Sequence, residues 1–169
     1  KYVCIATQTT GQCRYWNLKG GWDAIVRYLR KNGYKVVCID KYSSFGIEGQ
    51  YNLIPKEVID KTGDFPIEDR IVDINHAEFF IGTSSGLAWV AHAVGTPVVM
   101  ISGFTKPWNE FTTNIERVHN DKVCNGCWHT HEFNPGDWNF CPENKDFECS
   151  KQISFNMVKD KVDNIIGNL

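Results

Sequence analysis

The segment Phe79–Val94, FFIGTSSGLAWVAHAV, constrains the fold of this chain more than any other. Its start, Glu78–Gly82, is apolar enough for a short buried strand, and Thr83–Gly86 is a run of turn residues. Apolar residues then recur at helical spacing, at Leu87, Val90, Ala91 and Val94. A strand, a hydroxyl-rich turn and a helix form half of a βαβ unit. The free N–H groups of the helix start suit a phosphate, but serines there also act as ordinary caps, and both interpretations stay open.

The chain before this segment has the same alternation of strands and helices. Tyr2–Ala6 and Lys35–Ile39 are apolar strand candidates, and they flank a helix with one apolar face, at Trp22, Ile25, Val26 and Leu29. We expect Asp40–Leu53 to be a loop, and a short helix from Pro55 to Gly63. A second apolar stripe at Ile67, Ile71 and Ile74 predicts another helix.

After Val94, the sequence predicts strands at Val98–Ile101 and Ile115–His119 and a final helix over residues 154–166, capped by Ser154. Residues 121–150 lack any periodicity and hold four of the seven cysteines. The alternation predicts a single α/β domain over residues 1–169, with a Rossmann-like, doubly wound parallel sheet and a cysteine-bearing insertion. Ligands of such sheets bind beyond the carboxyl ends of the strands.

Composition excludes several classes of partner. The 169 residues carry a net charge of −2 without a basic run, so we expect no nucleic-acid partner. No apolar stretch approaches the length of a membrane span. The chain begins at Lys1 directly in a strand, and we expect a preceding domain to be missing from it.

The cysteines of the insertion have the spacing of a metal site. Cys124-x-x-Cys127 gives two thiolates from one turn, and Cys141 and Cys149 complete a tetrahedral set. Two disulfides or a redox pair at Cys124 and Cys127 are the alternatives, and thiolate chemistry alone does not separate iron from zinc. The segment also carries aromatic residues that either form a protomer contact or pack beneath the loop: Trp128, Phe133, Trp138 and Phe140.

Two motifs together carry a family resemblance. TTGQCRYW after the first strand and GTSSGLAWVAHAVGTPVVMISG resemble the C-terminal, nucleotide-binding half of heptosyltransferase-type GT-B glycosyltransferases. With CNGCWHTHEF, CPEN and Cys149 added, the chain resembles the iron-containing autotransporter heptosyltransferases. The resemblance implies ADP-heptose as donor, one iron ion on the four cysteines (zinc as the alternative), a homo-oligomer and a cytoplasmic enzyme. Its acceptor is a serine of an autotransporter protein, reached through the missing N-terminal domain, or a lipopolysaccharide.

The resemblance also implies roles for individual residues. Thr10 and Arg14 would grip the donor diphosphate, with Arg14 replacing the usual Lys. The turn would bind diphosphate and sugar, although many lipopolysaccharide enzymes carry Asp at the place of Ser84; its residues are Ser84, Ser85, Gly86 and Leu87. Asp40 would hold the ribose or merely cap a turn. Phe65 would lie at the adenine, on spacing alone.

The implied reaction is heptosyl transfer with inversion. Arg14, Thr10 and the helix start would stabilise the leaving diphosphate, and the general base would lie in the missing domain, so this chain alone should be inactive. Glu110 lies near the same rim, as a sugar contact or a surface acid. The competing hypothesis is a non-catalytic partner-binding module with a zinc-ribbon-like knuckle.

Overall fold

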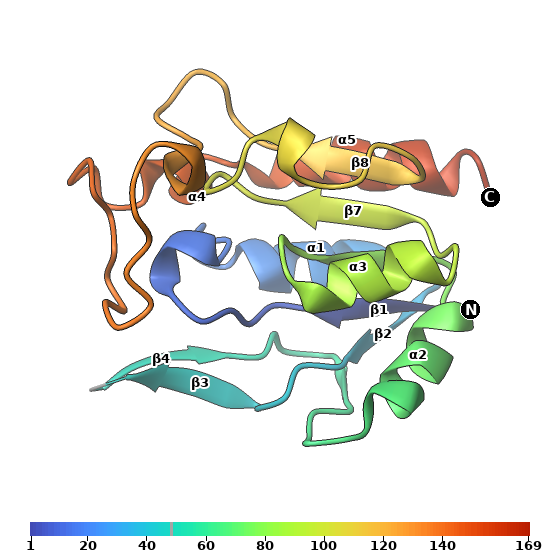
Figure 1. Cartoon of the computed structure of the whole chain (residues 1–169). Helices are drawn as coiled ribbons and strands as arrows, with labels where there is room; N and C mark the ends of the chain where they lie inside the picture. Colours follow the sequence, from blue (N-terminus) through green and yellow to red (C-terminus); the bar gives the residue numbers. More distant parts are fainter. Residues whose placement is uncertain (48) are drawn as a thin grey trace.

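Six parallel strands form the central sheet of this computed structural model, which describes residues 1–47 and 49–169 (Figure 1). Their spatial order is β5-β2-β1-β6-β7-β8, and every neighbouring pair is parallel. The strands are β1 (Tyr2–Ala6), β2 (Lys35–Cys38), β5 (Ile59–Asp60), β6 (Phe80–Thr83), β7 (Val98–Ile101) and β8 (Ile115–Val118). Every residue of β6 and β7 is buried, which explains why these strands are continuous apolar runs.

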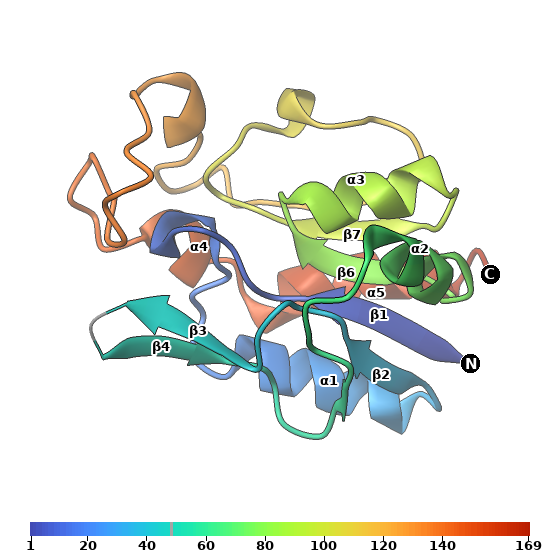
Figure 2. The ribbon, with the colours of Figure 1, turned by 60° about the horizontal axis from the view of Figure 1, so that its bottom comes forward.

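Helices cover both faces of the sheet (Figure 2). One core joins α1 (Gly21–Lys31) and α5 (Phe155–Ile166) to the sheet, through side chains such as Ile25 and Val162. A second core joins α2 (Ile67–Asn75) and α3 (Gly86–Ala93) to the opposite face. The doubly wound parallel sheet is therefore confirmed. Among the described residues, no helix combines the length and apolarity needed to cross a bilayer.

The strand order reverses between β1 and β6. From β1 the chain adds β2 and β5 on one side, then returns to add β6, β7 and β8 on the other. The loops that follow β1 and β6 therefore leave the sheet in opposite directions and open a crevice at its carboxyl edge. This is the position at which doubly wound sheets bind ligands.

Two predictions between β2 and α2 were wrong. The expected loop Asp40–Leu53 contains an antiparallel hairpin of β3 (Ser44–Ile47) and β4 (Gln50–Leu53); Glu48 lies outside the described residues. The two backbones are so close that a Cβ on Gly46 would lie 1.8 Å from the Gln50 carbonyl oxygen. The expected helix after Pro55 is replaced by β5, which pairs with β2 through Val37 and Ile59.

The last part of the chain largely follows the expectation. Ser154 caps α5, because its Oγ accepts a hydrogen bond from the Met157 backbone N at 3.2 Å. Residues 121–150, the cysteine segment, contain only a 3-10 turn at Cys127–His129 and the start of α4 (Glu148–Lys151). Figures 1 and 2 both place this segment and the β3–β4 hairpin at the end of the molecule opposite the two termini.

Candidate functional site: two hollows at the start of α3

Two hollows meet at the N-terminus of α3, in the crevice between β1 and β6. The larger hollow has a volume of about 370 Å³ and the smaller about 290 Å³, and Ser85 and Gly86 line both. The remaining walls of the larger hollow are Gln8, Thr9, Thr10, Asp40, Lys41, Tyr42, Phe45, Ile67 and Leu87. Those of the smaller are Arg14, Ser84, Trp89, Phe104, Thr105, Asn109 and Trp128.

The larger hollow offers a flat, apolar wall. The rings of Tyr42 and Phe45 stack with centroids 5.4 Å apart and planes 10° apart. Ile67 of α2 and Leu87 of α3 add aliphatic surface. Such a wall suits a planar aromatic ring that carries a few polar groups. The sequence interpretation missed Tyr42 and Phe45, because it assigned all of Asp40–Leu53 to a loop, including the hairpin that carries Phe45.

The start of α3 is free of internal capping. Its N-cap residue Ser85 is extended (φ −150°, ψ 171°), and its side chain makes no cap hydrogen bond. A Cβ on Gly86 would meet no atom within 4 Å, so no packing partner in the chain requires glycine here. The helix start therefore presents N–H groups and open space to both hollows, an arrangement suited to an anion.

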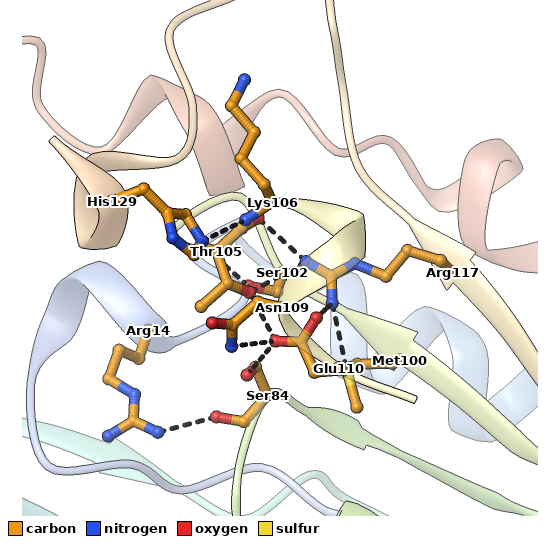
Figure 3. Close-up of polar contacts among 10 residues, drawn as sticks. All are labelled: Arg14, Ser84, Met100, Ser102, Thr105, Lys106, Asn109, Glu110, Arg117 and His129. Carbon is orange, nitrogen blue, oxygen red and sulfur yellow. Dashed lines mark hydrogen bonds and ion pairs between the residues drawn. The ribbon is translucent and has the colours of Figure 1, made fainter. Parts of the chain in front are cut away.

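Arg14 joins the loop after β1 to the turn after β6. Its Nη2 donates to the carbonyl oxygen of Ser84 at 2.7 Å, and its Nη1 donates to Thr10 Oγ1 at 3.3 Å (Figure 3 shows the Ser84 contact). Burial lowers the pKa of Arg14, with Cys13 and Glu110 acting in the opposite direction, and the guanidinium stays charged at physiological pH. The structure thus brings Thr10, Arg14 and the turn Ser84–Leu87 to one place, where the sequence predicted them.

Asp40 lines the larger hollow, but its carboxylate already has partners inside the chain. Its oxygens accept from the Thr7 backbone N at 2.9 Å, the Thr7 hydroxyl at 2.7 Å and the Gln8 backbone N at 3.1 Å. The Cys38 thiol adds a fourth donor at 3.3 Å. Burial raises the pKa of the Asp40 carboxyl, while the bonds from Thr7 and Gln8 lower it. These contacts favour the turn-holding interpretation of Asp40 over a ribose contact.

Phe65 lines neither hollow. Its ring lies 4.8 Å from the guanidinium carbon of Arg70, and 46% of its surface is exposed. The adenine role of Phe65 was expected from spacing along the chain alone, and it stays a prediction.

Glu110 is not a surface acid. Its side chain is fully buried, and Oε1 accepts hydrogen bonds from Ser84 Oγ at 2.5 Å and Thr105 Oγ1 at 2.7 Å (Figure 3). Its Oε2 pairs with the Arg117 guanidinium, which is only 10% exposed. Because the Ser84 hydroxyl donates its hydrogen bond to Glu110, the lone pairs of Ser84 Oγ remain to accept a hydrogen bond from a ligand. Ser84, Glu110 and Arg117 form one continuous polar network behind the smaller hollow.

The cysteine segment packs directly against the loop that carries this network. The backbone N–H groups of Gly126 and Trp128 donate to the carbonyl oxygens of Gly103 and Phe104 at 2.8 and 3.1 Å. His129 Nε2 accepts from the Lys106 backbone N at 3.1 Å (Figure 3). The segment therefore supports residues 103–106 from outside.

The four cysteines of the segment converge without forming a finished metal site. All seven cysteines are free thiols, which removes the disulfide alternative here. Burial, and then the neighbouring thiols of Cys124, Cys127 and Cys141, raise the pKa of Cys149 to about 12. Among the described residues, no three His, Cys, Asp or Glu side chains have the geometry of a metal site. Four thiols are a donor set that suits a metal ion with four thiolate ligands, and the binding of such an ion by these cysteines remains a prediction.

Most aromatic residues of the segment pack inward, as the alternative of packing beneath the loop predicts. Trp138 is 6% exposed, and its ring contacts those of Tyr15 and Phe45 with centroids 5.9 and 5.7 Å apart. Phe133 and Phe140 pack on a small core of Cys13, Phe104 and Cys127. Cys13 lies in the loop after β1, and its side chain is buried. Trp128 differs, with 45% of its surface exposed.

Known proteins share this sequence over nearly its whole length. Autotransporter heptosyltransferase BAHTCr of Citrobacter rodentium is 43% identical over 99% of the chain, and autotransporter heptosyltransferase TibC of Escherichia coli O78:H11 is 41% identical over 99%. Inactive autotransporter heptosyltransferase BimC of Burkholderia thailandensis is 36% identical over 98%. The chain spans 40–43% of the length of these relatives. No protein-family model matches it.

Solved structures agree. The chain superposes on E. coli ADP-heptose lipopolysaccharide heptosyltransferase II with a TM-score of 0.67 at 14% identity, covering 99% of this chain and 46% of that one. The fold is therefore that of one half of a GT-B heptosyltransferase. Crystal structures of the iron-containing, dodecameric glycosyltransferase TibC, one of them in complex with ADP-D-β-D-heptose, give TM-scores of 0.95 and 0.94 at 40% identity, covering 99% of this chain and 45% of theirs. The chain is a homologue of the autotransporter heptosyltransferases.

Proposed function

We propose that this chain is the donor-binding domain of a heptosyltransferase that transfers heptose from ADP-heptose to an autotransporter protein. The observation that carries the proposal is the placement of Arg14 and the uncapped start of α3 between two hollows. The larger hollow, with Tyr42 and Phe45, suits the adenine. The α3 start and Arg14 suit the diphosphate, and the smaller hollow suits the sugar. The homology to heptosyltransferases, and a TibC structure with ADP-heptose, support ADP-heptose as the donor.

Transfer breaks the bond between the anomeric carbon and the diphosphate oxygen, and the acceptor serine oxygen attacks from the opposite face, which inverts the configuration. Negative charge develops on the leaving ADP, and Arg14 and the α3 N–H groups stabilise that charge. Thr10, bonded to Arg14, orients the guanidinium. The serine proton goes to a base that we place in a preceding domain outside this chain, so the chain alone binds donor without turning it over.

We further propose that Cys124, Cys127, Cys141 and Cys149 hold one iron ion, with zinc as the alternative. TibC is described as iron-containing, and four neighbouring thiols are the donor set of a tetrathiolate site. Bound there, the ion would replace the aliphatic core that the segment lacks. Ferric tetrathiolate absorbs visible light and zinc does not, so the absorption spectrum with metal analysis of the purified chain distinguishes them.

Assembly and location follow as proposals from the same homology. TibC is described as dodecameric, and we expect this protein to form a homo-oligomer too. We expect the cytoplasm as its compartment, because the free cysteines and a nucleotide-sugar donor suit a reducing environment.

The test is calorimetry of ADP and ADP-heptose binding to this chain. Arg14→Ala should weaken both ligands by about 10- to 100-fold, the range expected when hydrogen bonds to a charged group are lost, whereas Arg14→Lys retains part of the affinity. The control is Arg27→Ala. Arg27 is an exposed cation of α1 that lines neither hollow, so this variant should leave both affinities unchanged. Failure of the unaltered chain to bind ADP would favour the alternative of a non-catalytic module.

A further inference from the structure

Two half-exposed tryptophans line the smaller hollow beside its charged group. Trp89 of α3 and Trp128 of the cysteine segment line it together with Arg14. Their exposed fractions are 47% and 45%, although each ring packs against a neighbour on one side. Large exposed aromatic surface that is rimmed by polar groups marks a binding site more often than a solvated face.

Both indoles are held in place by the chain. The Trp128 backbone N donates to the Phe104 carbonyl oxygen at 3.1 Å, and its ring makes an edge contact with the buried Phe104 ring at 6.0 Å. Trp89 makes an edge contact with the Phe111 ring, with centroids 5.2 Å apart. Binding therefore needs little further ordering of these side chains, which favours their use as fixed platforms.

The polar residues of the same hollow complement these platforms. Thr105 and Asn109 line it. Ser84 Oγ can also accept a hydrogen bond from a ligand, because its O–H group donates to Glu110. An aromatic face with hydroxyl and amide groups around it suits a ligand with an apolar C–H face and hydroxyl groups on its edges. A pyranose ring has this surface.

We propose that Trp128 and Trp89 bind the sugar ring of the donor, and that the cysteine segment thereby contributes a specificity-determining residue to the donor site. The proposal rests on the proposed function and deepens it at the sugar subsite. In this arrangement Arg14 and the α3 start hold the diphosphate, and the two indoles hold the sugar attached to it. The segment then acts on catalysis through a side chain of its own, in addition to its structural part.

The test compares two ligands, because ADP lacks the sugar. Trp128→Ala should weaken ADP-heptose by about three- to tenfold, the size expected for an aromatic contact, and leave ADP binding unchanged in calorimetry. Trp128→Phe should retain most of the affinity. The matched control is Trp108→Ala: Trp108 is 69% exposed and its ring contacts that of His129 in a tilted arrangement with centroids 4.0 Å apart, but it lines neither hollow. It should leave both affinities unchanged.

Several outcomes would overturn the inference. Equal weakening of ADP and ADP-heptose by Trp128→Ala would show that the indole supports the hollow rather than the sugar, and unchanged affinities would show no contact at all. Thermal unfolding and metal content of each variant verify that it is folded. If Trp128→Ala does not fold, Trp128→Leu, which keeps an apolar side chain without an aromatic face, gives the same comparison. If the unaltered chain binds neither ligand, the proposed function itself fails, which is a different result.

Discussion

The buried pair of Glu110 and Arg117 gives a quantitative prediction for stability. The Glu110 side chain is fully buried and that of Arg117 is 10% exposed, and Arg117 Nη2 also donates to the Thr105 carbonyl oxygen at 2.9 Å. Removing one member leaves the other as a buried charge without its partner, which costs about 3–5 kcal/mol. We therefore expect Glu110→Met and Arg117→Met each to destabilise the chain by about that amount.

Replacement of both charges by Met should cost far less than the sum of the single changes. No buried charge remains, but Ser84 and Thr105 lose the Glu110 oxygen to which they donate. At about 1 kcal/mol for each lost hydrogen bond, the double variant should be destabilised by roughly 2–3 kcal/mol. The expected coupling energy between the two sites is therefore several kcal/mol.

Urea unfolding followed by tryptophan fluorescence measures these differences through the transition midpoints, provided that the slopes agree among variants. Lys161→Ala is the matched control, because Lys161 pairs with Glu116 at 2.9 Å with side chains 39% and 27% exposed. Its effect should stay within about 1 kcal/mol. Additive single and double changes, or a cost below about 1 kcal/mol for Glu110→Met, would refute the reasoning.

Three further predictions follow from single residues. Gly86→Ala should raise the free energy of unfolding by about 0.5–1 kcal/mol, since the added Cβ meets no atom. The same methyl group fills the space beside the α3 start and should weaken the affinity for ADP at least tenfold. Unchanged affinity would place the anion elsewhere. Burial raises the pKa of the Asp40 carboxyl above 3.8 in the folded chain, so the folded state binds the carboxyl proton more tightly than the unfolded state does. The stability of the unaltered chain relative to Asp40→Asn should therefore fall as the pH rises above 3.8. Urea titrations at several pH values that show no pH dependence of this stability difference would contradict the prediction. Cys124→Ser should lower the bound metal measured by elemental analysis, whereas Cys38→Ala in β2 should not, and equal metal in both variants would remove Cys124 from the ligand set.

The parts of the fold that the sequence predicted correctly are those set by local apolar patterns. The run from Phe79 to Val94 predicted a strand, a turn and a helix, and β6 and α3 lie there. The position of Arg14 beside Ser84 follows from the same topology, because β1 and β6 are neighbours and their loops leave one edge of the sheet. Loop residues at that edge are predictable wherever the strand order is.

The errors arose where backbone contacts or distant packing decide the structure. The β3–β4 hairpin depends on the close approach of the two backbones at Gly46, which the interpretation of Asp40–Leu53 as a loop did not include. Phe45 lines the larger hollow through that unpredicted hairpin, whereas the adenine assignment to Phe65 used spacing along the chain and stays a prediction. Likewise, Glu110 gains its role from Arg117 and Ser84, and the sequence alone gives no sign that these three meet.

Trp138 has a consequence for any transplantation of the cysteine segment. Its indole lies between Tyr15 and Phe45, and its carbonyl oxygen accepts from the Gln12 backbone N at 2.9 Å. A chimera that receives residues 121–150 alone would therefore contain the Trp138 ring without the residues against which it packs. The loop after β1 and the hairpin would have to be moved with it, so these three pieces form one exchangeable unit.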